Sequence, residues 1–273
     1  MLSEDGKRRA LAYIQERRCK NGGFCFYRLE EPSGADTFYA VASLHLMGVR
    51  FPISSTTRYL RQFQRRDGSF RNIYEAFFVL KGLWYLRQPP TYPSHHYLKS
   101  LLKFPPGSSS LGVPLKRLYY IVDLADTYHV PVSPPFKEEI LSFVLSLENE
   151  NGGFGRPVPS LISTAYALHI LSLLRHPIHT MKTPSFLHAC EHPLHGFVNV
   201  PKTAPSFLEH VHAGLLLCLL LKRIPRYLPA CTHFIHRCQD RNGGFGRAPG
   251  GLPTLQDTWI ALHALKIIQN LSC

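Results

Sequence analysis

Acidic residues are scarce in this chain of 273 residues. Lys and Arg number 31 against 18 Asp and Glu, which gives a net charge of +13 with neutral histidines. A basic chain favours anionic partners, and nucleic acid, a membrane surface and a phosphorylated substrate are all compatible with this charge. Because 45% of the residues are hydrophobic and 12% are aromatic, we expect a sizeable core and no extensive disorder.

Long apolar runs and paired cysteines are also lacking. The longest apolar run, from Ala213 to Leu221, is far shorter than the roughly 20 residues that span a bilayer. The N-terminal segment is too charged for a signal peptide. The seven cysteines include no CxxC pair, so a disulfide framework is not expected. The sequence predicts a soluble, cytoplasmic protein whose basic surface leaves peripheral membrane contact open.

Strand-like alternation of apolar and polar residues is lacking too, and a repeated turn takes its place. Glycine followed within two positions by phenylalanine recurs at Phe24, Phe70, Phe154, Phe197 and Phe245. Neighbouring copies are about 45 residues apart, and a degenerate copy that starts at Phe104 fills the one double interval. The chain is therefore predicted to contain six copies of one unit.

Each unit predicts two helices. The first helix of each unit is amphipathic and should show one face to water: 3–18, 54–66, 94–104, 134–147, 184–190 and 226–238. The second helix is apolar almost all round and should be buried: 36–48, 74–86, 118–128, 163–174, 209–221 and 257–268. The pattern predicts an all-α protein, in which an apolar inner ring of helices is surrounded by an amphipathic outer ring.

Two of the repeated turns carry a family resemblance. Gln62 to Phe70 (QFQRRDGSF) and Cys238 to Arg247 (CQDRNGGFGR) resemble the repeat of the prenyltransferase and squalene-cyclase superfamily. The segment that begins at Asn151 (NGGFGRPVPSLISTAYALHIL) resembles the repeat of protein prenyltransferase β subunits. This resemblance implies a single α/α-toroid domain over residues 1–273, built from six helical hairpins. It also implies an apolar central cavity that holds an isoprenoid chain, with the diphosphate at a basic rim.

Acidic residues recur at one register position of the inner helices. Alignment of these helices on their shared leucines places four acids at the first position: Asp36, Glu75, Glu209 and Asp257. Asp is a favoured helix N-cap, and any acid interacts well with the positive end of the helix dipole. The alternative interpretation is a catalytic ring of acids at one mouth of the toroid, which would bind Mg²⁺ or act as general bases.

Arginines recur shortly after the repeated turns. They are Arg28, Arg71, Arg156 and Arg247. The resemblance implies that they bind the diphosphate, a role that suits guanidinium because its fork binds phosphate with two hydrogen bonds. The lysine that follows in the family is replaced by Val158. The competing interpretation is that each arginine pairs with a rim acid such as Asp257 and only closes its loop.

Aromatic residues on the inner helices are the predicted lining of the cavity. Phe38, Tyr39, Tyr166 and Trp259 are the chosen substrate-binding residues, with Tyr74, Phe78 and Tyr120 beside them. Aromatic faces attract cations, so such rings can stabilise an allylic carbocation. Simple core packing is the alternative for these residues, and hydrogen-bonded core positions are the interpretation for His169 and His263.

Two chemistries of the superfamily lack their residues in this sequence. The zinc ligands implied by the resemblance fall on Leu161, Ser163 and Asp257, so zinc is not expected and no metal ligand is assigned. The segment from His188 to His195 offers donors at irregular spacing only. The proton donor of class II terpene cyclases falls on Gln256 or Ala35, and neither side chain is acidic.

Two functions follow from these observations. The first is an enzyme of prenyltransferase-like or terpene-cyclase-like type that acts on an isoprenoid diphosphate. The second is a non-catalytic toroid, which would carry a prenyl lipid or act as a β-like subunit beside a helical partner. No nucleic-acid motif or stacking platform is present in the sequence, so nucleic acid is not an expected partner.

Overall fold

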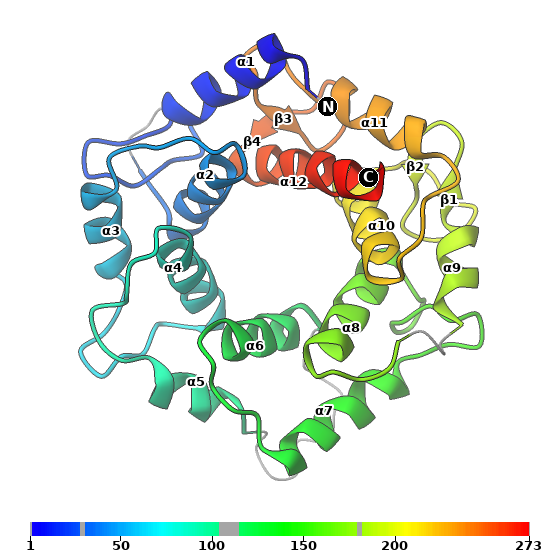
Figure 1. The fold of residues 1–273 in the computed structure, drawn as a ribbon, viewed down its shortest axis with the longest axis horizontal. Helices are drawn as coiled ribbons and strands as arrows, with labels where there is room; N and C mark the ends of the chain where they lie inside the picture. Colours follow the sequence, from blue (N-terminus) through cyan, green and yellow to red (C-terminus); the bar gives the residue numbers. More distant parts are fainter. Residues whose placement is uncertain (1, 28–30, 104–114, 179–181, 273) are drawn as a thin grey trace.

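A computed structural model describes residues 2–27, 31–103, 115–178 and 182–272, and these residues form two concentric rings of helices (Figure 1). The inner ring contains α2 (Gly34–Leu46), α4 (Ile73–Tyr85), α6 (Leu115–Thr127), α8 (Leu161–Leu173), α10 (Leu208–Leu220) and α12 (Leu255–Ser272). The outer ring contains α1 (Glu4–Gln15), α3 (Ser54–Arg61), α5 (His95–Leu101), α7 (Pro134–Ser146), α9 (Thr183–Ala189) and α11 (Leu228–Arg237). The predicted all-α toroid of helical hairpins is confirmed.

Each inner helix packs against its two neighbours in the ring, and α12 closes the ring onto α2. The inner helices bury most of their residues, whereas the outer helices α1, α3 and α11 bury one face only. Within the described ranges, no helix combines the length and the apolarity needed to cross a membrane. The six cysteines of these ranges are free and buried.

Two minimal hairpins of strands interrupt the helical pattern. β1 (Glu191–His192) pairs antiparallel with β2 (Gly196–Phe197), and β3 (Phe245–Gly246) pairs with β4 (Pro253–Thr254). Both lie in the turn between an outer and an inner helix, and each strand has only two residues. Such short strands leave no alternating pattern that a sequence could reveal.

The inner helices begin earlier than the sequence predicts. Ser33 and Asn72 are the N-caps of α2 and α4, and their side chains accept from the backbone N–H of Asp36 and Glu75. Asp36 is therefore the third residue of its helix, and Thr254 accepts from the N–H of Asp257 in the same way. The interpretation of Asp36 and Asp257 as N-caps is wrong, because a hydroxyl three positions earlier caps each helix.

The repeated Gly-Gly-Phe turn links the outer and inner helix of one unit and packs against the outer helix of the next unit. Its first glycine has a positive φ, for example 82° at Gly152, which a side chain would strain. A Cβ on the second glycine, Gly153, would lie 2.6 Å from the ring of Phe186 in the next outer helix. The phenylalanine, here Phe154, is fully buried, and its N–H donates to Thr164 Oγ1 in the inner helix at 2.9 Å.

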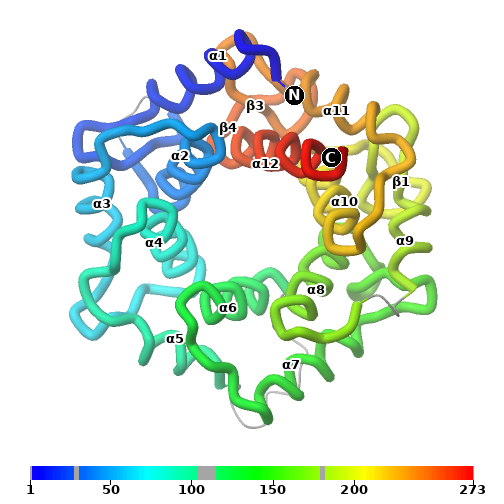
Figure 2. Tube along the Cα trace, viewed as in Figure 1, coloured from blue at the N-terminus to red at the C-terminus, as the bar shows by residue number. Residues whose placement is uncertain are grey.

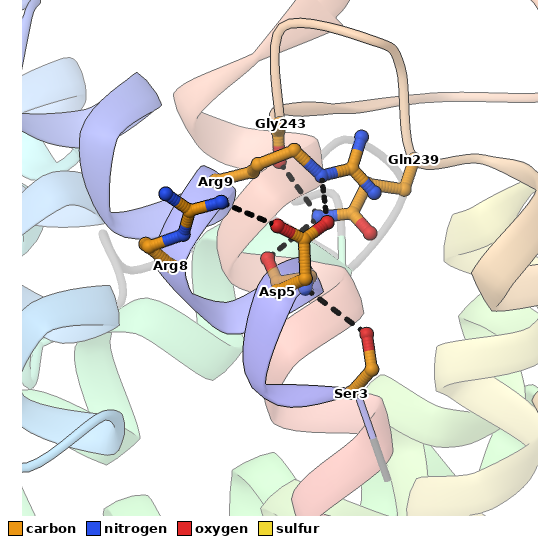
Figure 3. A network of polar contacts seen from close by, with 7 residues as sticks. Ser3, Asp5, Arg8, Arg9, Gln239 and Gly243 are labelled. Carbon is orange, nitrogen blue, oxygen red and sulfur yellow. Dashed lines mark hydrogen bonds and ion pairs between the residues drawn. The ribbon is translucent and has the colours of Figure 1, made fainter.

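The same turn closes the ring between the last unit and the first. The tube in Figure 2 shows α1 beside the last repeat. Gln239 Nε2 donates to the carbonyl oxygens of Gly6 at 2.9 Å and of Gly243 at 3.0 Å. Asp5 holds Arg8 and Arg9 nearby, at 2.7 and 3.0 Å (Figure 3). The first outer helix thus takes the place of a following repeat.

Candidate functional site

The repeated turns lie at one mouth of the toroid. Phe24 and Phe245 donate their N–H groups to Thr37 and Thr258, in the first turns of α2 and α12. The turns and the N-terminal ends of the inner helices therefore lie on the same side, which we call the N-terminal mouth. Its predicted functional groups are the arginines and the four acids.

Arg156 is engaged with the backbone. Its guanidinium donates to the carbonyl oxygens of Ser146, Leu147 and Gly155 at 2.7, 3.0 and 3.1 Å. Ser146 and Leu147 lie at the C-terminal end of α7, whose last carbonyls have no partner within the helix. Arg156 thus closes a turn in this structure, but through backbone carbonyls rather than through the rim acid of the competing interpretation.

Arg247 is the arginine that forms an ion pair at the mouth. Its Nε and Nη2 both reach Oε1 of Glu209, with the Nε at 2.7 Å, and its guanidinium lies 4.2 Å from the centre of the Phe207 ring. The hydrogen bond to Glu209 raises the pKa of Arg247. Its partner is Glu209 rather than the suggested Asp257. The other predicted arginines are less informative, because Arg71 is exposed and Arg28 lies outside the described residues.

The four predicted acids are held separately. Asp36 Oδ2 accepts from Ser33 Oγ at 2.6 Å, and Asp257 Oδ2 accepts from Thr254 Oγ1 at 2.7 Å. Burial raises the pKa of both carboxyls, and Glu209 raises that of Asp257 further. Glu75 accepts from the backbone of its own turn. Glu209 and Asp257 are therefore the two acids that share one electrostatic environment.

The residues at the zinc positions do not fit a zinc site. Leu161 is fully buried and has no donor atom, and Ser163 Oγ is hydrogen-bonded to Ser160 Oγ at 3.0 Å. Within the described part of the chain, no group of three or more His, Cys, Asp or Glu side chains could hold a metal ion. Zn²⁺ takes three or four such ligands.

The centre of the ring contains the predicted aromatic side chains. Phe38 and Tyr39 of α2 lie 6.1 and 5.7 Å from the ring of Trp259 in α12, and 5.6 and 5.5 Å from Phe78 in α4. Burial is the main cause that raises the pKa of Tyr39, and the nearby Tyr166 raises it further. The ring of Tyr166 in α8, on the opposite side of the inner ring from α2 (Figure 1), contacts Tyr119 of α6 at 5.4 Å.

Five polar side chains share this centre, and sequence reasoning did not select them as a group. They are Lys81, Asp123, His169, His212 and His263, which we call the polar belt. Each comes from a different inner helix, from α4 to α12. All five are partly accessible rather than fully buried. A register signal exists, because four of them lie six positions after Glu75, Arg117, Ser163 and Asp257.

The belt consists of two bonded pairs with a histidine between them. Lys81 Nζ lies 2.9 Å from Asp123 Oδ2, and His212 Nε2 lies 2.8 Å from His263 Nδ1. The ring of His169 contacts Tyr119 at 5.2 Å, and its pKa is lowered by burial and raised by Asp123. His263 is therefore hydrogen-bonded, as predicted.

The two bonded histidines are neutral near pH 7. Burial lowers the pKa of His263 to about 4 and that of His212 well below its usual value. The ring of Trp259 stacks on His263 at 5.1 Å and meets His212 edge-on at 5.7 Å. A neutral hydrogen-bonded pair of imidazoles thus lies directly beside the aromatic wall.

A cleft of about 440 Å³ lies at the other mouth of the toroid. Its walls come from the C-terminal parts of α2 and α4 and from residues just after α4 and α6: His45, Trp84, Tyr85, Arg87, Gln88, Pro89 and Tyr128. Burial raises the pKa of Tyr85, and the nearby Asp123 raises it further. The cleft therefore lies close to the Lys81–Asp123 end of the polar belt.

Comparison with known proteins identifies one family and several similar structures. The family described as prenyltransferase alpha-alpha toroid domain matches residues 1–82 and 94–273. No curated protein matches the sequence significantly. Candida albicans protein geranylgeranyltransferase-I, complexed with GGPP, has a TM-score of 0.72 and 16% identity, over 96% of this chain and 90% of that one.

Two further structures are similar over nearly their whole length. A variant of the type II terpene cyclase MstE from Scytonema, in complex with its product merosterolic acid A, has a TM-score of 0.61 and 12% identity, over 98% of this chain and 97% of that one. A protein from Actinoplanes has a TM-score of 0.59 and 15% identity, over 97% of this chain and 99% of that one. At these identities the likeness shows the fold.

Proposed function

Because the chain belongs to the prenyltransferase alpha-alpha toroid family, we propose that it is an enzyme that binds an isoprenoid diphosphate and converts its prenyl chain inside the ring. The observation that supports this proposal best is the contact of aromatic side chains from α2, α4 and α12 with one another at the centre. An apolar chain gains free energy from such a lining, and aromatic faces also stabilise a developing carbocation.

The diphosphate would bind at the N-terminal mouth. Arg247 is more than half exposed and is held by Glu209 alone among charged groups, so it can exchange this partner for a diphosphate oxygen. Arg156, Arg71 and Arg28 follow the equivalent turns and would add charge around the same mouth. Arginine binds phosphate with two parallel hydrogen bonds. These bonds stabilise the negative charge that develops on the leaving diphosphate in the transition state.

Magnesium would assist at the same place. Mg²⁺ is usually held by one or two carboxylates together with substrate phosphates, and Glu209 and Asp257 are the two acids close enough to influence each other. When bound, the ion would neutralise the charge that develops on the diphosphate. Asp36 and Glu75, which lie in the first turn of α2 and of α4, would complete the acidic side of the mouth.

Binding of farnesyl or geranylgeranyl diphosphate, measured by isothermal titration calorimetry, tests the proposal. We expect binding to the wild-type protein and a loss of at least 10-fold in affinity for Arg156→Ala/Arg247→Ala. The matched control is Arg223→Ala, which removes an exposed arginine just beyond the C-terminal end of α10, at the opposite end of that helix from Glu209. Absence of binding to the wild type, or equal binding by the double variant, rules the proposal out.

A non-catalytic role is the second candidate. Arg156 is already saturated by backbone carbonyls, and the residues at the zinc and proton-donor positions do not perform those chemistries. In that case the chain would carry a prenyl lipid or form one subunit beside a helical partner. Pull-down from native lysate followed by lipid extraction separates these roles, because a carrier retains an unconverted lipid and a subunit retains a stoichiometric protein.

A further inference from the structure

The polar belt contains a feature that the binding of a hydrocarbon chain does not require. Burial of five polar or charged side chains in an aromatic centre is costly unless they are bonded. Two hydrogen-bonded imidazoles, His212 and His263, lie against Trp259, the ring that also contacts Phe38 and Tyr39. The two imidazoles are therefore in contact with the aromatic cluster at the centre of the ring.

We propose that the His212–His263 pair is the catalytic base that removes a proton from a prenyl carbocation, so that the enzyme releases a cyclic hydrocarbon. This inference rests on the proposed function and specifies its reaction. The neighbouring Trp259 would stabilise the same cation from which the proton is taken.

The geometry of the pair guarantees a free acceptor. One ring donates an N–H in the His212 Nε2–His263 Nδ1 hydrogen bond, and the other ring accepts. If His212 donates, its Nδ1 keeps a free lone pair; if His263 donates, its Nε2 keeps one. Within the described residues neither outer nitrogen has another hydrogen-bond partner, and both rings are partly accessible. In either tautomer, the pair presents one unprotonated nitrogen.

The step balances without a further reactant. The allylic C–O bond breaks and its electron pair leaves with the diphosphate, which leaves a carbocation. A C–H bond beside the cationic carbon then breaks, its electron pair forms the new C=C bond, and the proton goes to the free imidazole nitrogen. The hydrogen bond lets this proton charge be shared by the second ring, which passes a proton on to water when the site reopens.

The depth of the pair determines the kind of product. His263 follows Asp257 by six residues on α12, and this places it about 9 Å below the N-terminal mouth along the helix axis. With the diphosphate at the mouth, the pair faces the middle of the chain rather than the carbon that carried the leaving group. In ring closure the π electron pair of an internal C=C bond of the chain forms the new C–C bond to the cationic carbon, and the positive charge moves to the other carbon of that C=C bond, at the depth of the pair. Loss of the proton from the neighbouring C–H bond then gives a cyclic hydrocarbon.

Asp123 is the competing base in the same belt. Its carboxylate is already paired with Lys81 Nζ at 2.9 Å, and Lys81 also donates to Thr127 Oγ1 at 3.1 Å. Both histidines contact the ring of Trp259. The geometry therefore favours the imidazole pair.

Product analysis tests the assignment. The purified protein is incubated with geranylgeranyl or farnesyl diphosphate and Mg²⁺, and the extract is separated by gas chromatography with mass detection. For the wild type we expect a cyclic hydrocarbon. For His212→Gln/His263→Gln we expect at least a 10-fold smaller hydrocarbon yield and a prenyl or cyclic alcohol from capture by water. Glutamine retains a hydrogen bond between α10 and α12 but has no basic nitrogen.

The controls separate this inference from the proposed function. Calorimetric binding by the double variant should equal that of the wild type, and His188→Gln, an exposed histidine of α9, should change neither binding nor products. Each single variant is assayed too, in case the double variant does not fold. The assignment is overturned if the wild type binds but forms no hydrocarbon, if the variants keep the hydrocarbon yield, or if Asp123→Asn alone abolishes it. Loss of wild-type binding instead overturns the proposed function itself.

Discussion

Gly244 of the last repeat lies directly against the ring of Tyr13 in α1, and this contact closes the circle of repeats. A Cβ at Gly244 would overlap that ring, which is fully buried and also carries the guanidinium of Arg17 at 3.3 Å. Gly23 lies against Tyr59 and Gly153 against Phe186 in the same way. The second glycine of the turn is therefore a packing residue in at least three of the repeats.

Gly244→Ala should destabilise the fold, because neither the backbone nor the buried ring can move away freely. Overpacking of this kind costs about 1–3 kcal/mol. The measurement is urea unfolding followed by circular dichroism. The matched control is Gly34→Ala at the start of α2, where the nearest atom to the added Cβ is 3.5 Å away, so that variant should be neutral or slightly stabilised. Equal midpoints for the two variants would contradict the packing role.

Thr258→Val should cost about 1–3 kcal/mol through one buried hydrogen bond. Thr258 Oγ1 accepts the N–H of the fully buried Phe245 at 3.1 Å and donates to Thr254 O at 2.6 Å. Valine has the same shape but leaves that N–H without a partner. Thr203→Val serves as the control, since its hydroxyl makes an exposed bond to Val200 O. Similar unfolding free energies for both variants would refute this interpretation.

The sequence predicts the architecture because each unit contains local signals that do not depend on the others. The positive φ of Gly152 and the burial of Phe154 follow from one short turn, and the apolar inner helices follow from composition. The starts of the inner helices were misplaced by one to three residues. For α2 and α12 the reason is that the capping hydroxyls Ser33 and Thr254 precede the apolar runs. An N-cap residue can be recognised in a sequence only when the start of the helix that follows it is placed correctly.

The candidate site was less predictable, because its polar members are far apart in the chain. His212 and His263 are 51 positions apart, and each is a single polar residue in an apolar helix, which ordinarily indicates a bonded core side chain. The alignment of the repeats brings four members of the polar belt to one register position, and His212, three positions after Glu209, joins them only through its hydrogen bond to His263. The repeated positions of the arginines were predictable from the sequence. Their partners, which are Ser146 O for Arg156 and Glu209 for Arg247, were not, because these contacts depend on the geometry of the loops.

Glu209→Ala should affect ligand binding more than stability. The Arg247–Glu209 pair is exposed on the arginine side, and exposed pairs contribute about 0–1 kcal/mol. Its removal frees the Arg247 guanidinium, so thermal unfolding should shift little while calorimetric affinity for inorganic diphosphate, measured without Mg²⁺, rises. Glu4→Ala, which breaks the exposed pair with Lys7 in α1, is the control for an unrelated ion pair. A large loss of stability, or no change in affinity, would show that Glu209 has another role.

Lys81→Met should destabilise the protein by about 3 kcal/mol, because it leaves Asp123 unpaired in a poorly hydrated centre. Only 15% and 13% of the two side chains are exposed. The double variant Lys81→Met/Asp123→Leu removes both charges and should recover most of this loss. Urea unfolding of both variants is the measurement. If the double variant is less stable than the single one, the ion pair stabilises the fold by itself, and the cost of the single variant is not explained by the unpaired charge of Asp123.

Acidification should weaken the fold through the buried histidines. The pKa of His263 is about 4 in the folded chain against 6.5 ordinarily, so between these values the unfolded chain binds a proton that the folded chain does not. The free energy of unfolding therefore falls as the pH drops through this window, by on the order of 3 kcal/mol at most. His212 and His169 have lowered pKa values and act in the same direction. Asp36 and Asp257, whose pKa values are raised, act in the opposite direction and titrate at the acidic end.

The window between about pH 7 and about pH 5 isolates the histidines, since the ordinary carboxyls are still ionised there. Urea unfolding at both ends should show a smaller loss of stability for His263→Gln than for the wild type, because the variant has no imidazole to protonate at that position. Equal losses for His263→Gln and the wild type would mean that His263 accepts a proton in the folded chain as readily as in the unfolded one. The burial that lowers the pKa of His263 would then be absent, and the pair would not stay neutral as the pH falls below about 6.5.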